Sequence, residues 1–241
     1  RVVDNDQWYR LRHWQRMRPS GNPGDPEPAS AWLLNCLLNK HADAMDNFPE
    51  PVVLPREEGD RADATVLSAV LPVILEQNEF EQTYSDMWWQ ELKSGAGILG
   101  VFWNPAKHGG QGDVDVRRVD ILNLFWEPGV TDIQDSRNVF HVELHDNDEL
   151  LARYPQLEGK LGQGADRPQV YVYDDAIDTS KKSAVVDWYY KRGGLLHYAK
   201  LVNGEVLYAS QEDPACAQRG FYDHGKYPFV FDTLFSCEGT P

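Results

Sequence analysis

The chain has 241 residues, of which 41% are hydrophobic and 25% charged, and its 23 basic and 38 acidic residues give a net charge of -15 at pH 7. These proportions are those of a folded protein with one large domain or two small ones. No apolar run is long enough to cross a bilayer, which excludes a transmembrane protein, and the acidic surface disfavours a sequence-specific DNA reader.

The three cysteines, Cys36, Cys216 and Cys237, form no Cys-x-x-Cys pair. Their odd number argues against a disulfide framework or a zinc knuckle and indicates a reducing cytoplasm. The sequence begins at Arg1 rather than Met and stops at Pro241, directly after a loop-like segment, and nothing in it resembles a signal peptide. We therefore expect it to be a piece of a longer protein.

The first 18 residues differ in charge from the rest of the chain. Their arginines are Arg1, Arg10, Arg12, Arg16 and Arg18. Against two aspartates they give a local charge of +3, which leaves -18 for the remaining residues. Trp8, Tyr9 and Trp14 lie between the arginines, a composition typical of a nucleic-acid arm. An amphipathic segment that docks its aromatic side chains on an acidic body explains the pattern equally well, and we favour docking because five arginines are few beside a full basic face.

Residues 19–28 contain four prolines and two glycines, and they predict a linker or an exposed loop. Residues 1–28 are therefore expected to form a basic arm and a Pro/Gly linker. The main region, residues 29–241, divides by pattern into a helical part, 29–95, and a β-rich part, 96–241.

Apolar residues recur at helical spacing in three stretches of the helical part. A stripe from Leu33 to Met45 predicts a packed helix that ends near Asn47. Asp60 can cap a second helix, whose apolar face is formed by Val66, Leu67, Val70, Leu71, Ile74 and Leu75. It should kink or restart at Pro72, which lacks a backbone donor. The spacing from Phe80 to Leu92 predicts a third helix that ends at Gly95.

The β-rich part begins with a buried strand predicted over 98–103, followed by a Pro/Gly-rich turn and extended segments within 114–126. Further on, Phe140, Val142 and Leu144 alternate with His141, Glu143 and His145. That period of two predicts a strand whose apolar residues lie on a buried face and whose polar residues lie on a solvent-exposed face. A short helix is expected over 148–154, and the Gly-rich residues 159–168 are expected to be mobile.

The last third predicts a three-stranded antiparallel meander. Its strands, 185–191, 195–202 and 205–209, are joined by the tight-turn pairs Gly193-Gly194 and Asn203-Gly204, and a further strand is expected over 227–231. Because helices come first and strands later, the predicted class is α+β, with N-terminal helices packed on an antiparallel or mixed sheet that includes the meander.

Three local patterns could in principle be sites for chemistry. Gly109-Gly110-Gln111-Gly112 lacks the lysine and the helix of a phosphate-binding loop, and Ser94-Gly95 lacks the strand of a nucleophile elbow. His141, Glu143 and His145 would point the same way on one strand and could hold a divalent metal. The polar side of an ordinary antiparallel sheet gives the same pattern, so we expect no metal site.

Paired acidic residues raise the possibility of a glycosidase. The pairs are Asp113/Asp115, Glu143/Asp146 and Asp174/Asp175, and the sugar platforms would be Trp88, Trp89, Trp103 and Trp126. Such pairs arise by chance among 38 acidic residues, and periodicity places Trp88 and Trp103 in the core. No candidate base has an orienting partner visible in the sequence. We therefore expect no catalytic, cofactor-binding or metal-binding residue, and the alternative function is a carbohydrate-binding or carbohydrate-active module.

The order of features resembles the N-terminal half of the portal proteins of tailed bacteriophages. The segments that carry the resemblance are Asp6-Gln7-Trp8-Tyr9, the helix from Leu33 to Asp43, Pro49-Glu50-Pro51, the helices from Asp60 and into Gly95, the strand Gly100 to Asn104, Gly112-Asp113-Val114, and Val119 to Gly129. They span nearly the whole chain and are packing and turn motifs rather than reaction motifs.

The resemblance implies a wing-like fold and a structural role without catalysis or cofactor. In that family a full-length subunit joins a ring, usually dodecameric, at one capsid vertex of the virion, after assembly in the bacterial host cytoplasm. Double-stranded DNA passes through the ring without sequence-specific binding. The implied partners are other copies of the subunit, the terminase, the capsid and head-tail connector proteins. The stem, clip and crown would follow Pro241.

Overall fold

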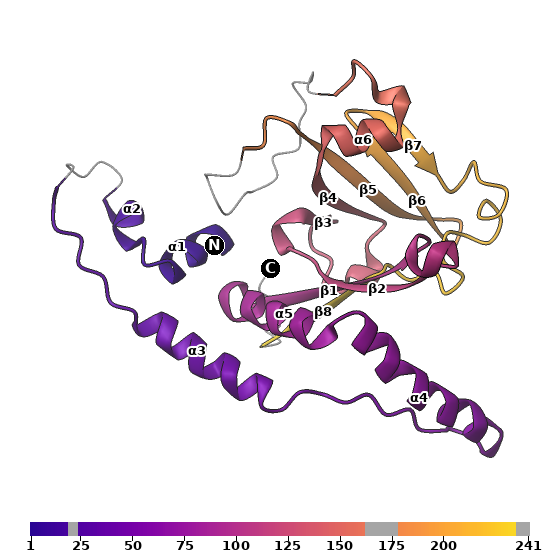
Figure 1. The fold of residues 1–241 in the computed structure, drawn as a ribbon, viewed down its shortest axis with the longest axis horizontal. Helices are drawn as coiled ribbons and strands as arrows, with labels where there is room; N and C mark the ends of the chain where they lie inside the picture. The colour runs from indigo at the N-terminus through magenta and orange to yellow at the C-terminus, as the bar shows by residue number, and fades with distance from the viewer. Residues whose placement is uncertain (19–23, 162–177, 235–241) are drawn as a thin grey trace. The chain divides into compact units, whose positions relative to one another are not determined.

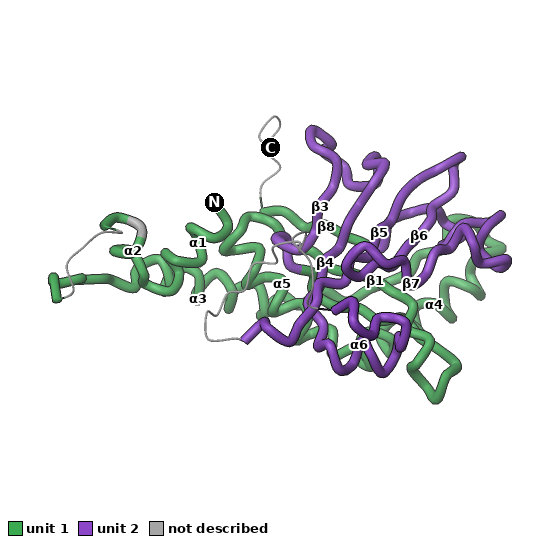
Figure 2. Tube along the Cα trace, turned by 90° about the horizontal axis from the view of Figure 1, so that it is seen from above, with its two compact units in different colours: residues 1–119, 229–238 green, residues 120–228, 239–241 purple. Residues whose placement is uncertain are grey.

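The computed structural model describes residues 1–18, 24–161 and 178–234 (Figure 1). The chain folds into two compact units, one formed by residues 1–119 with the last strand, β8 (Phe229–Thr233), and the other by residues 120–228 (Figure 2). Most of the helices belong to the first unit and most of the strands to the second, so the predicted α+β class is confirmed. Residues 162–168, part of the stretch expected to be mobile, lie outside the described residues.

Five α-helices precede the first strand, and the three predicted in this part of the chain are confirmed. The helices are α1 (Val2–Tyr9), α2 (His13–Met17), α3 (Trp32–Met45), α4 (Arg61–Gln77) and α5 (Phe80–Ser94). α4 continues through Pro72, so the expected restart is wrong. Pro72 is exposed, and water can reach the carbonyl that the missing N–H leaves without a donor. Gly95 ends α5 with φ +91°, a conformation that favours glycine.

The sheet of the first unit has the order β2-β1-β8 and is antiparallel throughout. Its remaining strands are β1 (Ala96–Asn104) and β2 (Asp113–Arg118). α5 lies along one face of this sheet (Figure 1). The approach is close, because a Cβ added at Gly97 of β1 would lie 2.7 Å from Met87 Cγ of α5. Met87, Ile98 and Phe229 are each at most 2% exposed and form the centre of this unit.

The second unit is built on a five-stranded antiparallel sheet of order β3-β4-β5-β6-β7. Its strands are β3 (Leu124–Trp126), β4 (Asn138–Asp146), β5 (Lys182–Arg192), β6 (Leu195–Val202) and β7 (Glu205–Ala209), and α6 (Asn147–Arg153) follows β4. β5, β6 and β7 are the predicted meander. Asn203 and Gly204 both have positive φ, as the two-residue hairpin turn requires. Leu150 and Leu157 pack with Val185 and Val202 as a buried cluster.

The predicted assignment of the buried and solvent-exposed faces of β4 is wrong. His141, assigned to the exposed face, is 2% exposed. Phe140, assigned to the buried face, is 37% exposed and stacks on Trp188 with ring centroids 5.9 Å apart. Val142, next to His141, is also buried, so both faces are covered at this point. Alternation in sequence shows which residues share a face, but the neighbouring elements decide which face is covered.

Candidate functional site

α4 is an apolar helix that leaves most of its surface exposed. From Ala64 to Leu75 it carries no charged residue, yet Ala64 is its only buried residue. Val66, Leu67, Val70 and Val73 are 43–59% exposed, and we refer to them as the α4 face. Val66, Val70 and Val73 follow at spacings of four and three, so they share one side of the helix. The apolar face predicted for this helix includes Val66, Leu67 and Val70, and these three residues are exposed in the structure.

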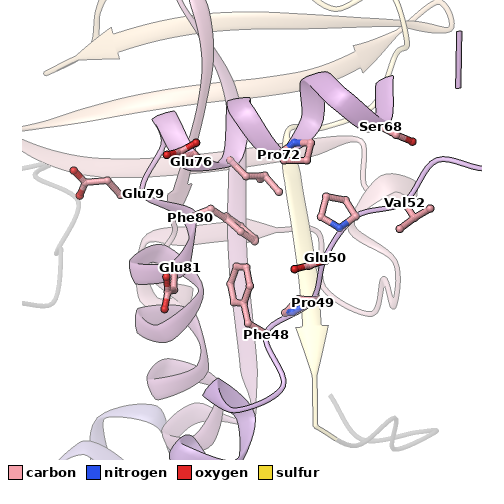
Figure 3. Close-up of a pocket in the computed structure, with 12 residues that line it drawn as sticks. Phe48, Pro49, Glu50, Val52, Ser68, Pro72, Glu76, Glu79, Phe80 and Glu81 are labelled. Atoms are coloured by element: carbon pink, nitrogen blue, oxygen red, sulfur yellow. The ribbon is translucent and has the colours of Figure 1, made fainter. Parts of the chain in front are cut away.

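A groove of about 620 Å³ lies between α4, the start of α5 and the extended segment after α3 (Figure 3). Its apolar lining is Phe48, Pro49, Pro51, Val52, Pro72, Leu75 and Phe80. Phe48 and Phe80 contact each other edge to face with ring centroids 6.0 Å apart. Ser68 and four glutamates, Glu50, Glu76, Glu79 and Glu81, complete the lining. None of these four forms an ion pair with another described residue.

The surroundings of this acidic groove are strongly negative. Residues 50–81, which include all of α4, contain eight acidic residues and two arginines, a local charge of -6. A large apolar surface in such a setting is typical of a protein interaction site that recognises an apolar and basic partner. Such an arrangement is suited to binding by shape and charge.

The N-terminal segment docks on the body of its own unit, in agreement with the interpretation favoured from the sequence. Asp6 of α1 is 2% exposed, and its carboxylate lies 2.8 Å from Arg10 Nε and 3.8 Å from Lys93 Nζ of α5. Tyr9 lies near Trp89, with ring centroids 6.2 Å apart. The polarity differs from the expectation, since an acid of the segment meets a base of the body.

Several side chains of the N-terminal segment and of the start of α3 remain exposed. Trp8 is 38% exposed, Met17 58% and Trp32 76%, and Arg12 is exposed as well. Trp8 and Leu33 line the same small cavity of about 220 Å³, so α1 and the start of α3 are adjacent. We refer to Trp8, Arg12, Met17, Trp32 and Leu33 as the N-terminal patch.

A buried polar row crosses the sheet of the second unit. The register pairs His141 of β4 with Asp187 of β5, and Asp187 with Lys200 of β6. Asp187 Oδ1 accepts a hydrogen bond from Tyr198 Oη at 2.6 Å and lies 2.7 Å from Lys200 Nζ. Burial, reinforced by the Asp187 carboxylate, raises the pKa of Tyr198 far above its usual value. Tyr198 therefore stays a hydrogen-bond donor and holds Asp187 in place.

The same row contains the part of the structure closest to a metal site. Potential ligand atoms of His141, Glu143 and Asp187 lie within 4.8 Å of one another. His145, the third residue of the sequence candidate, is not in this group and is half-exposed, 3.6 Å from Glu143. A cation here would compete with the Lys200 ammonium for Asp187. Sequence analysis missed Asp187 and Lys200 because only the strand register brings them beside His141.

Glu91 is a buried carboxyl group in the first unit, on the side of α5 that faces β1. It is 1% exposed, and burial, together with Asp232 of β8, raises the pKa of Glu91 to about 7. Its Oε2 atom has no hydrogen-bond partner among the residues that the structure describes. Helical periodicity places Glu91 near the packed side of α5, but the sequence does not show how completely the sheet covers it.

The acidic pairs of the glycosidase alternative have local partners. Asp113 accepts from the Val114 N–H and lies 2.8 Å from His108 Nε2, two contacts that lower the pKa of Asp113. Asp115 pairs with Lys107 at 2.9 Å, and Asp146 pairs with Lys182 at the same distance. Asp174 and Asp175 lie outside the described residues. None of the described members lines either of the two cavities above.

The tryptophans do not form a sugar platform. Trp89 stacks on His41 with ring centroids 4.3 Å apart, and Trp88 and Trp126 are only partly exposed. Trp103 is 55% exposed, so its assignment to the core is wrong. It covers Gly112, where an added Cβ would lie 2.5 Å from the indole ring. Gly112, Gly110 and Gly109 all have positive φ and form the predicted turn.

Comparison with known proteins decides between an assembly component and a carbohydrate module. The family model of the phage P22-like portal protein matches residues 42–225. The chain belongs to this family. The match covers roughly three quarters of the portal chain and includes α4, the acidic groove and nearly all of the second unit. No curated protein matches the chain.

Family membership confirms the resemblance found in the sequence and gives the chain a structural role in the phage portal, at the capsid vertex of the virion. The portal family forms ring oligomers, so a surface for neighbouring subunits is required. The carbohydrate alternative is not supported. Within the described residues, no helix is both long and apolar enough to span a membrane.

Proposed function

We propose that this chain is the wing-side portion of a portal subunit, with residues 1–28 as arm and linker, and 29–241 as the wing-like region. The complete subunit forms a dodecameric ring through which double-stranded DNA is packaged and later ejected. The family match over residues 42–225 carries this proposal. The predicted partners are the capsid, the terminase during packaging and head-tail connector proteins afterwards, with assembly in the host cytoplasm.

The charge of the chain agrees with a conduit for DNA. A passage for a polyanion works best when its surroundings bind phosphate weakly, and the net charge of -15 disfavours such binding. Tight binding would hold DNA in place. The proposed role therefore depends on shape and on contacts between subunits, not on making or breaking bonds.

Electron microscopy and DNA binding test this function together. The complete polypeptide that carries this sequence should form rings with a central opening, and DNA affinity at moderate salt should be weak and independent of sequence. A polypeptide that stays monomeric at high concentration, or particles without an opening, would contradict the portal proposal. Saturable quenching of tryptophan fluorescence by an oligosaccharide would instead favour the carbohydrate module.

A further inference from the structure

The α4 face has the properties of a buried surface that lacks its partner. A helix that is apolar on all sides is normally covered on all sides, and four large apolar residues at 43–59% exposure are unusual in an isolated domain. α4 belongs to the matched family region, and the ring that we propose needs a subunit contact.

Ring symmetry adds a second requirement. In a closed ring of more than two subunits, each subunit contacts its neighbours through two different surfaces, since the contact is head to tail. The first unit exposes two apolar surfaces of opposite electrostatic character. The α4 face lies within a region of charge -6, whereas Trp8, Arg12 and Met17 of the N-terminal patch belong to residues 1–18, whose charge is +3, and residues 1–33, which contain the whole patch, carry +1.

We propose that the N-terminal patch of the neighbouring copy packs around α4 of one subunit. It contacts the α4 face on one side of the helix and the acidic groove, to which α4 contributes Ser68, Pro72 and Leu75, on the other side. The inference rests on the proposed portal function, and it names the surfaces that hold the ring together. Trp32 and Met17 supply the apolar part of the contact. Arg12 faces the glutamates of the groove, together with the nearby Arg18, whose side chain is 43% exposed and lies 3.4 Å from Asp25 within its own subunit. Tryptophan and arginine are the residue types that contribute most strongly to protein interfaces, and a groove of about 620 Å³ has room for an aromatic side chain.

The first experiment places a charge on the α4 face of the complete polypeptide. Val70→Asp should reduce the fraction of subunits in rings at least tenfold and leave the thermal unfolding midpoint of the monomer unchanged, because Val70 is 43% exposed. Val206→Asp is the matched control, since Val206 is 57% exposed on β7 of the other unit. Rings of Val70→Asp at the wild-type level would overturn the interface.

The second experiment tests the occupant by exchanging charges. The pair Arg12→Glu and Arg18→Glu should weaken ring formation, and so should the pair Glu76→Lys and Glu81→Lys. All four substitutions together should restore at least half of the wild-type ring fraction, because the attraction is then re-formed with reversed sign. Failure to restore rings would show that the α4 face binds something other than the N-terminal patch, which overturns the proposal.

Cross-linking supplies a readout that does not depend on how the charged variants fold. In a background with Cys36→Ser and Cys237→Ser, Val70→Cys and Trp32→Cys subunits are mixed and treated with a short bismaleimide. Cross-linked pairs should form in the mixture and not in either variant alone. Pairs of Val70→Cys with itself would indicate a two-fold contact and contradict the proposal.

The outcomes separate this inference from the function on which it rests. A wild-type polypeptide that never forms rings overturns the portal proposal, and the interface with it. Wild-type rings that tolerate Val70→Asp overturn only the interface.

Discussion

α4 and α5 are neighbouring helices of similar length, yet their environments are opposite to what their compositions suggest. α5 carries many polar residues and buries Met87, Gln90 and Glu91 against the sheet. α4 is far more apolar and buries only Ala64. Within one chain the apolar helix would be expected to occupy the core. The reversal shows that the core of the first unit and the exposed apolar surface of α4 are separate, so that each can be tested without the other.

The largest loss of stability is expected in the second unit, at the buried polar row formed by His141, Asp187 and Lys200. Asp187→Asn should lower the free energy of unfolding by about 3–5 kcal/mol, because it leaves the Lys200 ammonium and the Tyr198 hydroxyl without the charged acceptor that they share. Asp146→Asn is the control. Its carboxylate pairs with Lys182 but is 53% exposed, so the cost should stay below about 1 kcal/mol. Urea unfolding measures both, and equal costs would contradict the role given to burial.

Met87 tests the buried side of α5. Met87→Ala should lower the free energy of unfolding by about 3 kcal/mol, since the side chain is 2% exposed and its loss leaves a cavity beside Gly97. The measurement is again urea unfolding, with Met17→Ala as a control, because Met17 is 58% exposed. A cost below about 1 kcal/mol for Met87→Ala would mean that α5 is not packed as described.

Glu91 makes the stability of the first unit depend on pH. Because the folded pKa of about 7 lies above the unfolded value of 4.5, the folded state holds the proton more tightly. The contribution of Glu91 is therefore complete below pH about 4.5 and is lost as the pH rises to about 7, a change of about 2–3 kcal/mol. Relative to wild type, Glu91→Gln should gain stability over this interval. A difference that does not vary with pH would show that Glu91 titrates normally.

The smallest effect is expected on α4. Val70→Ala should change the unfolding free energy of the monomer by no more than about 0.5 kcal/mol, because the side chain is 43% exposed and alanine favours helix. A smaller loss of unfolding free energy for Val70→Ala than for Met87→Ala would show that α4 is exposed where α5 is buried. If Val70→Ala cost as much as Met87→Ala in a monomer, the α4 face would already be covered within the chain, and the reasoning from its exposure would fail.

Much of the secondary structure was predictable, because it depends on residues close together in the sequence. Helical spacing located α3, α4 and α5, and the pairs Gly193-Gly194 and Asn203-Gly204 fixed the turns of the meander. Individual environments were harder to predict. Phe140 and Trp103 were expected to be buried, and both are more than a third exposed. A periodic pattern identifies a face without identifying what lies opposite it.

The sequence by itself determined the α+β class, the order of helices and strands, and the contrast between a basic start and an acidic body, because composition, periodicity and turn chemistry are local properties. The order of its motifs also showed the resemblance to portal proteins. Only the tertiary structure decided that β8 returns to pair with β1, that Asp187 joins His141 and Lys200 in one row, and that α4 lies open while α5 is covered. Each of these depends on contacts between residues far apart in the chain, and the burial of a side chain is a property of its neighbours as much as of itself.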